Sequence, residues 1–253
     1  MASEAFDLTG RTALITGSSR GIGKALAIGL AEAGATVVLN GVDRNRLEIT
    51  RAELAGRFGE DRVRAVAFDV TDEDEVLRGT AEAGHVDILV NNAGVQHREP
   101  LVDVSLENWE RVLRTDLTSA FLVGRTVARG MLERGYGKIV NICSVQTDLA
   151  RPTIAAYTAA KGGLRNLTRA MTAEWAGAGI TINGVAPGYI HTEMTQNLVD
   201  NETFNSWILG RTPAGRWGLV EDLIGPTVWL CSDASAYVNG QVIFVDGGMT
   251  VVV

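Results

Sequence analysis

The chain has 253 residues, of which 46% are hydrophobic, and this is enough to bury a sizeable core. Its net charge of −7 argues against a nucleic-acid-binding protein, because such proteins neutralise phosphates with a basic face. The two cysteines indicate neither a disulfide framework nor a metal site. No apolar stretch reaches the ~18 residues that a membrane span needs. The N-terminal MASEAFDLTGR does not have the pattern of a signal peptide. We therefore expect a cytoplasmic protein with no metal and no nucleic-acid or membrane partner.

Short β-branched runs alternate with helical periods along the whole chain. The expected strands are Thr12–Thr16, Thr36–Asn40, Arg64–Phe68, Ile88–Asn91, Lys138–Asn141, Thr181–Val185 and Val242–Val245. The expected helices are Gly23–Ala33, Asp72–Ala83, Leu106–Glu133, Ile154–Ala176 and Val220–Cys231. Strands that are apolar nearly throughout suit a parallel sheet buried on both faces. The sequence thus predicts the α/β class: one Rossmann-like domain over residues 1–253, a doubly wound parallel sheet of about seven strands with helices on both faces.

A glycine-rich turn, TGSSRGIG, follows the first expected strand and opens the first expected helix. Its glycines are Gly17, Gly21 and Gly23, in a G-x-x-x-G-x-G spacing. Ser18 and Ala25 stand where a triphosphatase loop needs glycine and a hydroxyl, so that loop is excluded. The glycines would let the backbone approach a dinucleotide pyrophosphate at the helix N-terminus. A turn with no ligand is the alternative at this point.

Three side chains further along form an acid–base pattern. Tyr157 and Lys161 are four residues apart on an expected helix, so they share one face. Ser144 follows the expected strand Lys138–Asn141 at its carboxyl end. A neighbouring ammonium group favours the phenolate and lowers the pKa of a tyrosine, which would suit Tyr157 to proton transfer. Ser144 could hydrogen-bond the oxygen of a carbonyl or an alcohol.

These motifs together resemble the short-chain dehydrogenase/reductase family over nearly the whole chain. TGSSRGIG is similar to the family's cofactor loop, and matching segments are Asp69-Val70, the NNAG of residues 91–94, Pro187-Gly188 with Thr192, and the DGG of residues 246–248. The resemblance implies that Tyr157 donates and accepts the proton, Lys161 binds the nicotinamide ribose and lowers the pKa of that tyrosine, and Ser144 positions the substrate oxygen. The implied cofactor contacts are Gly17, Ser19, Arg20, Gly21, Ile22, Gly23, Asp69, Val70, Asn91, Ala93, Gly94, Tyr157, Lys161, Pro187, Gly188, Ile190 and Thr192.

One position departs from the family pattern. Asp116 stands where the family usually has an asparagine that completes a catalytic tetrad with Ser144, Tyr157 and Lys161. Aspartate is nearly isosteric with asparagine and still accepts hydrogen bonds, but it cannot donate one when ionised, and its charge favours a protonated Lys161. We expect activity to survive this substitution.

The end of the second expected strand bears on the choice of cofactor. The residue at the position that usually holds the acid of NAD-dependent enzymes is Gly41, which leaves room for a 2′-phosphate. Arg20 is the first candidate to bind that phosphate, and Arg44 is a second. Arg20 as a solvated loop residue is the alternative. We expect NADP(H) as the favoured cofactor and leave open the use of NAD(H) as well.

The loops that would hold the substrate resemble those of family members that act on sugar acids. The resemblance implies interconversion of D-gluconate and 5-keto-D-gluconate. Such a polyol carboxylate needs many hydrogen bonds and at least one cation, for which Arg151 is the first candidate. The expected substrate contacts are Ser144, Gln146, Arg151, Tyr157, Gln96 and Glu193.

Other functions remain alternatives at this point. Another ketone reductase of the family, such as a 3-oxoacyl-[acyl-carrier-protein] reductase, would share the same core motifs. A non-catalytic dinucleotide sensor would tolerate loss of the serine, tyrosine and lysine, and their joint presence argues against it. The resemblance also implies a homotetramer, built through Leu106–Glu133, Ile154–Ala176 and the C-terminal residues 247–253.

Overall fold

The computed structural model describes residues 4–252, and within this range seven strands form one parallel sheet. The strands are β1 (Thr12–Ile15), β2 (Thr36–Asn40), β3 (Val63–Val66), β4 (Ile88–Asn91), β5 (Gly137–Ile142), β6 (Ile180–Pro187) and β7 (Val242–Val245). Their order in the sheet is β3-β2-β1-β4-β5-β6-β7, so the chain starts in the middle and winds outward in both directions. The predicted α/β class with a doubly wound sheet is confirmed.

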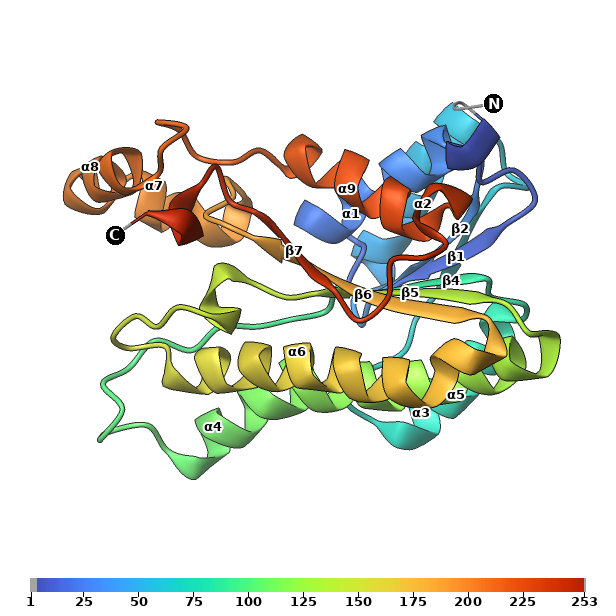
Figure 1. Cartoon of the computed structure of the whole chain (residues 1–253), viewed down its shortest axis with the longest axis horizontal. Helices are drawn as coiled ribbons and strands as arrows, with labels where there is room; N and C mark the ends of the chain where they lie inside the picture. The colour runs from blue at the N-terminus through green and yellow to red at the C-terminus, as the bar shows by residue number, and fades with distance from the viewer. Residues whose placement is uncertain (1–3, 253) are drawn as a thin grey trace.

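Helices cover both faces of the sheet (Figure 1). They are α1 (Gly21–Glu32), α2 (Arg44–Phe58), α3 (Glu73–Ala83), α4 (Leu106–Leu113), α5 (Ser119–Arg134), α6 (Ala155–Trp175), α7 (Gln196–Val199), α8 (Glu202–Arg211) and α9 (Ile224–Cys231). Helices α1, α2 and α9 lie on one face and α3, α4, α5 and α6 on the other, while α7 and α8 project from the end of the sheet where β6 finishes. The sheet is therefore the middle layer of three.

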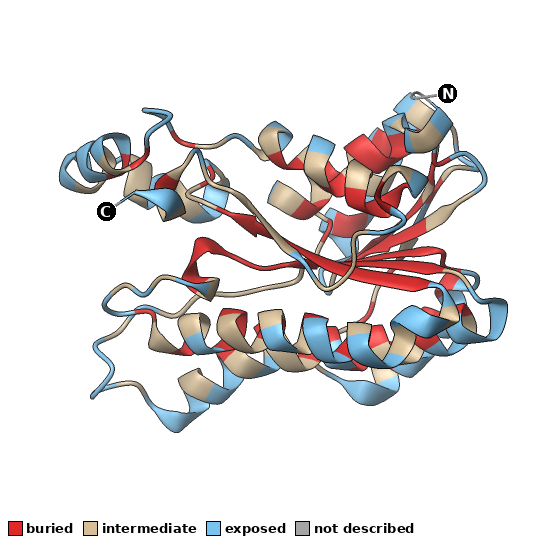
Figure 2. Cartoon of the chain, in the orientation of Figure 1, coloured by how far each residue is buried: buried red, intermediate tan, exposed pale blue. Residues whose placement is uncertain are grey.

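The core follows from the apolar character of the strands. Side chains that alternate along β1 pack into different layers: Ala13 and Ile15 join the cluster under α1, and Leu14 joins the cluster under α5 and α6. The central strands are buried along their whole length, and exposed residues lie on the outer faces of the helices and in the loops (Figure 2). A rigid middle layer of this kind fixes the positions of the loops that leave its carboxyl edge.

The expected long helix 106–133 is continuous in space but not uniformly α-helical. A π-helical turn, Arg114–Thr118, separates α4 from α5. The wider turn adds one residue to the repeat, and such turns occur frequently at functional sites. Here it carries Asp116, which is 1% exposed.

Three helices were not expected from the sequence: α2, α7 and α8. Helix α2 buries few apolar side chains, among them Leu47 and Leu54, so its periodic signal is weak. Its start is fixed locally, because the Asp43 carboxylate accepts a hydrogen bond from the backbone N–H of Arg46. The C-terminal residue Val253, named above in the expected subunit contact, lies outside the described residues.

No helix among residues 4–252 is long and apolar enough to cross a membrane. In the same part of the chain, no three His, Cys, Asp or Glu side chains are grouped so that they could hold a metal ion. Cys143 and Cys231 are both buried and unbridged.

Candidate active site

A cavity of about 670 Å³ opens at the carboxyl ends of the strands, where the strand order reverses between β1 and β4. This is the edge at which doubly wound sheets bind their ligands. Nearly every residue expected at the site lines this cavity. These are Gly17, Ser19, Arg20, Gly21, Ile22, Gly23, Asp69, Val70, Ala93, Gly94, Gln96, Asp116, Ser144, Gln146, Arg151, Tyr157, Lys161, Pro187, Gly188, Ile190, Thr192 and Glu193.

Asn91 was expected to contact the cofactor but lies outside the lining. Its side-chain amide donates to Asn141 Oδ1 at 2.9 Å, so it ties β4 to β5 inside the sheet. The next residue, Asn92, lines the cavity in its place. Side chains alternate along a strand, and this sends the two asparagines in different directions.

The glycine loop is built against the turn after β4. Gly17 has a φ of +62°, and a Cβ on it would lie 2.9 Å from the backbone Cα of Ala93. A Cβ on Gly23 would lie 2.5 Å from both Asn92 Nδ2 and Gly17 O. The Asn92 amide donates to Gly17 O at 3.0 Å and holds the two loops together. Glycine is needed at these two positions because the atoms of the neighbouring loop segments leave no room for a Cβ.

The start of α1 faces the cavity with its backbone N–H groups. Arg20 precedes the helix, and its side chain does not cap it. Gly21 has a φ of +54°, and the space around its missing Cβ holds no atom within 4 Å. Uncapped N–H groups at a helix N-terminus attract an anion, and the open space in front of Gly21 lets a pyrophosphate approach. These residues fit a dinucleotide.

The cations near the end of β2 are only partly those expected. Arg20 and Arg46 line the cavity beside Gly41, whereas Arg44 does not. Arg20 Nη1 contacts Glu193 Oε2 at 3.2 Å, and both side chains are more than half exposed. An exposed ion pair contributes little free energy, so this contact does not prevent Arg20 from meeting another anion.

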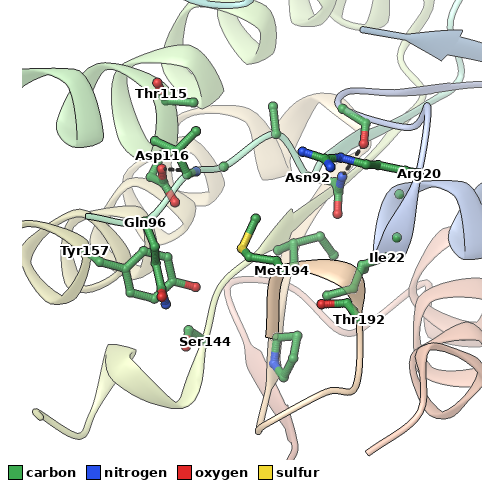
Figure 3. A pocket seen from close by; sticks show the side chains of 18 of the residues that line it. Arg20, Ile22, Asn92, Gln96, Thr115, Asp116, Ser144, Tyr157, Thr192 and Met194 are labelled. Atoms are coloured by element: carbon green, nitrogen blue, oxygen red, sulfur yellow. Dashed lines mark hydrogen bonds between the residues drawn. The ribbon is translucent and has the colours of Figure 1, made fainter. Parts of the chain in front are cut away.

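The acid–base side chains meet at the other end of the cavity, on β5 and α6 (Figure 3). Lys161 is 4% exposed, and its ammonium donates to the carbonyl of Ile142 at 2.9 Å. Its Nζ lies 5.4 Å from the centre of the Tyr157 ring. Ser144, just beyond β5, begins a short helical turn, and its hydroxyl accepts from the N–H of Gln146 at 3.2 Å. Ser144 and Tyr157 both face the open cavity.

Burial dominates the electrostatics of this group. Desolvation raises the pKa of Tyr157, while the Lys161 charge lowers it, Asp116 raises it, and a hydrogen bond with Ser144 lowers it. Desolvation lowers the pKa of Lys161, but the Asp116 carboxylate and Tyr157 raise it, and its pKa ends above the ordinary value. The expected lowering of the Tyr157 pKa by Lys161 is present, but burial outweighs it and the pKa is raised overall.

Beyond Ser144 the cavity is lined by polar and cationic groups. Gln146 is 6% exposed, and neither its Oε1 nor the Nε of Arg151 has a hydrogen-bond partner among the described residues. Arg98 and Arg151 both line this cavity. Burial lowers the pKa of Arg98, and the charge of Arg151 lowers it further. Two cations that repel each other, beside unpaired polar atoms, favour an anionic group placed between them.

The lining also includes Arg46 and Tyr189, which were not among the expected contacts. Tyr189 follows Pro187-Gly188 directly, and its ring stacks edge-on with Trp207 and Phe204 of α8. Arg151 lies 5.1 Å from the centre of the Phe204 ring. The position of Tyr189 directly after Pro187-Gly188 could have indicated that it lies at the site. The packing of α8 against Tyr189 could be found only in the structure.

The site joins a pyrophosphate loop to a half-buried tyrosine and a buried lysine and serine in one cavity. This is the arrangement of a dinucleotide-dependent oxidoreductase. The family model described as enoyl-(acyl carrier protein) reductase matches residues 17–250. The chain belongs to the short-chain dehydrogenase/reductase family, as its motifs predicted.

Individual relatives cover almost the whole chain. Gluconate 5-dehydrogenase of Gluconobacter oxydans (strain 621H) is 52% identical over 97% of both chains. A 2-dehydro-3-deoxy-D-gluconate 5-dehydrogenase of Formosa agariphila is 43% identical over 98% of this chain and 96% of the relative. The crystal structure of a gluconate 5-dehydrogenase from Burkholderia cenocepacia J2315 in complex with NADP and tartrate matches with a TM-score of 0.96 and 48% identity over 100% of both chains.

Proposed function

We propose that this enzyme interconverts D-gluconate and 5-keto-D-gluconate with NADP(H). The observation that carries the substrate is the pair Arg98 and Arg151 beside Gln146, at the same end of the cavity as Ser144 and Tyr157. A sugar acid presents a carboxylate for the arginines and hydroxyls for the unpaired amide. The relatives named gluconate 5-dehydrogenase support this assignment.

The residues act on the ketone oxygen during reduction. The bound nicotinamide supplies hydride chemistry. Tyr157 gives its phenolic proton to the ketone oxygen, and the Ser144 hydroxyl donates a hydrogen bond to the same oxygen. Lys161 stabilises the phenolate that remains. In oxidation the phenolate takes the proton back from the alcohol.

A substrate panel tests this proposal. We expect purified enzyme with NADPH to reduce 5-keto-D-gluconate, and with NADP+ to oxidise D-gluconate, at a kcat/KM at least about tenfold above that for an acetoacetyl thioester, which brings no carboxylate to the arginines. A 2-dehydro-3-deoxy-D-gluconate substrate belongs in the panel because of the relative with that name. If the enzyme prefers 2-dehydro-3-deoxy-D-gluconate, the proposed carboxylate subsite stands and the proposed substrate is wrong. If it prefers the thioester, both the subsite and the substrate are wrong.

The choice of NADP(H) over NAD(H) rests on Arg20, which lines the cavity beside Gly41. We expect Arg20→Ser to lower kcat/KM for NADPH about tenfold or more, because a charge-assisted contact to the 2′-phosphate is lost, and to leave NADH nearly unchanged. The matched control is Arg44→Ser, because Arg44 is exposed and lies outside the lining. An equal loss with both cofactors would show that Arg20 acts on the loop and not on the phosphate.

We also propose that the enzyme is a cytoplasmic homotetramer, as its family suggests. Exposed apolar side chains beside and on the expected contact helices support this assembly: Val102 is 94%, Leu106 70% and Phe121 41% exposed. Multi-angle light scattering would give the mass, and a one-subunit mass would remove the proposal.

A further inference from the structure

The carboxylate of Asp116 contacts the ammonium of the catalytic lysine, Lys161. The residue lies in the π-helical turn Arg114–Thr118 and is 1% exposed. Its Oδ2 is 3.3 Å from Lys161 Nζ, and both side chains are almost fully buried. Because water is excluded, this ion pair is screened far less than one on the surface. A change of charge at Asp116 therefore alters the protonation equilibria of Lys161 and of Tyr157 next to it.

The local packing holds this carboxylate in one orientation. Oδ1 accepts a hydrogen bond from the backbone N–H of Val95 at 2.8 Å. Oδ2 has no hydrogen-bond partner among the described residues, so the ammonium of Lys161 is its main stabilising contact. A Cβ on Gly94 would lie 2.8 Å from Oδ2, which shows that the loop after β4 closes directly over it.

Lys161 is consequently shared between two acids. Its ammonium faces the Asp116 carboxylate on one side and the Tyr157 ring on the other. Burial raises the pKa of Asp116, while the charge of Lys161, the hydrogen bond from Val95 N–H and the charge of Arg111 on α4 lower it. Cys143, just after β5, raises the pKa values of Lys161 and Tyr157. The ionised Asp116 carboxylate takes part of the stabilisation that the lysine would otherwise give to a phenolate.

We propose that Asp116 is a positioning residue that sets the pH range in which Tyr157 exchanges its proton. It holds Lys161 as a cation and disfavours a second negative charge at the phenol. The phenol thus stays protonated to higher pH than it would beside a neutral amide. This suits Tyr157 to proton donation, the step that ketone reduction needs. The equilibrium constant of the overall reaction is unaffected, because a catalyst cannot change it.

The sharpest variant is Asp116→Asn. It keeps the size of the side chain and the acceptor for Val95 N–H, removes the charge and places an amide NH2 where Oδ2 stood. With Lys161 protonated, loss of the Asp116 charge lowers the pKa of Tyr157, so the phenolate forms at lower pH. We expect the acid limb of kcat/KM for D-gluconate oxidation with NADP+ to move down by about one pH unit, as for loss of a nearby like charge. On the acid side of the limb this means about tenfold faster oxidation.

A titration without substrate provides a second readout. Tyrosinate absorbance is followed on wild type and Asp116→Asn from about pH 7 to about pH 11, with and without NADP+. Tyr157→Phe serves as the blank, because the chain has four tyrosines. We expect the Tyr157 component to appear at lower pH in Asp116→Asn. This readout needs no turnover, so it separates failure of this proposal from failure of the proposed substrate.

The matched control is Asp87→Asn. Asp87 is also buried, at 5% exposed, and accepts a hydrogen bond from the Thr12 N–H at 2.9 Å, but it lies before β4 at the opposite edge of the sheet. It should leave both pH profiles where they are. If Asp116→Asn does not fold, Asp116→Ser also removes the charge and keeps a small acceptor. A limb that stays in place or moves to higher pH in the folded variant overturns the proposal.

Discussion

Replacing Tyr157 by phenylalanine is expected to lower kcat about 10²- to 10⁴-fold while the affinity for NADPH changes little. The phenolic oxygen is the group at this end of the cavity that can give a proton to the ketone oxygen, and phenylalanine keeps the ring that fills the space. Stopped-flow turnover and quenching of NADPH fluorescence measure the two effects separately. The split matters because it separates chemistry from cofactor binding.

The same substitution at Tyr136 is the control. Tyr136 packs under Arg11, whose guanidinium carbon lies 4.0 Å from the ring centre, at the other edge of the sheet, and burial raises its pKa to about 12. Tyr136→Phe should leave kcat unchanged. If Tyr157→Phe kept wild-type turnover, the acid–base role of this tyrosine would be refuted and another proton donor would have to be found. If neither protein turned over any ketone and both bound NADPH, a dinucleotide sensor would explain the chain better.

The strands could be predicted because burial on both faces leaves a direct mark on the sequence. Every expected strand overlaps an observed one, and β2, β4 and β7 have the expected bounds. The helices without a strong apolar period could not be found in this way, as α2 shows. The π-helical turn Arg114–Thr118 could not be predicted either, because one extra residue in a turn leaves no mark on the amino-acid composition of the helix. Yet that turn decides how Asp116 faces Lys161.

The site also contains features that could be predicted from the sequence and features that could not. The residues of the glycine motif lie close together in the sequence, and so do those of the acid–base motif. Both motifs follow strands of a parallel sheet, so their meeting at its carboxyl ends could be predicted. The approach of Arg98 to Arg151 joins loops that are far apart in the chain, and no local pattern announces it. The contact of Arg20 with Glu193 is a case of the same kind. The balance of burial against the lysine charge at Tyr157 also depends on packing that spacing cannot give.

The largest effect on substrate recognition is expected at Arg151. We expect Arg151→Met to raise KM for 5-keto-D-gluconate about 10- to 100-fold, because a charge-assisted hydrogen bond to the carboxylate is lost. Methionine keeps much of the apolar stem that packs near Phe204 and Tyr189. Since Arg151 is not expected to touch the reacting atoms, kcat at saturating substrate should fall by less than about tenfold.

Arg165→Met is the matched control for this variant. Arg165 pairs with Asp148 on the surface side of α6 and does not line the cavity, so its loss should leave KM unchanged. Arg151→Lys sharpens the reading, because it retains the charge but not the fork that binds a carboxylate with two parallel hydrogen bonds. An intermediate KM would indicate that both charge and geometry contribute. If KM stayed at the wild-type value in Arg151→Met, the carboxylate would have to be held elsewhere, and Arg98 is the cation in the same region that could hold it.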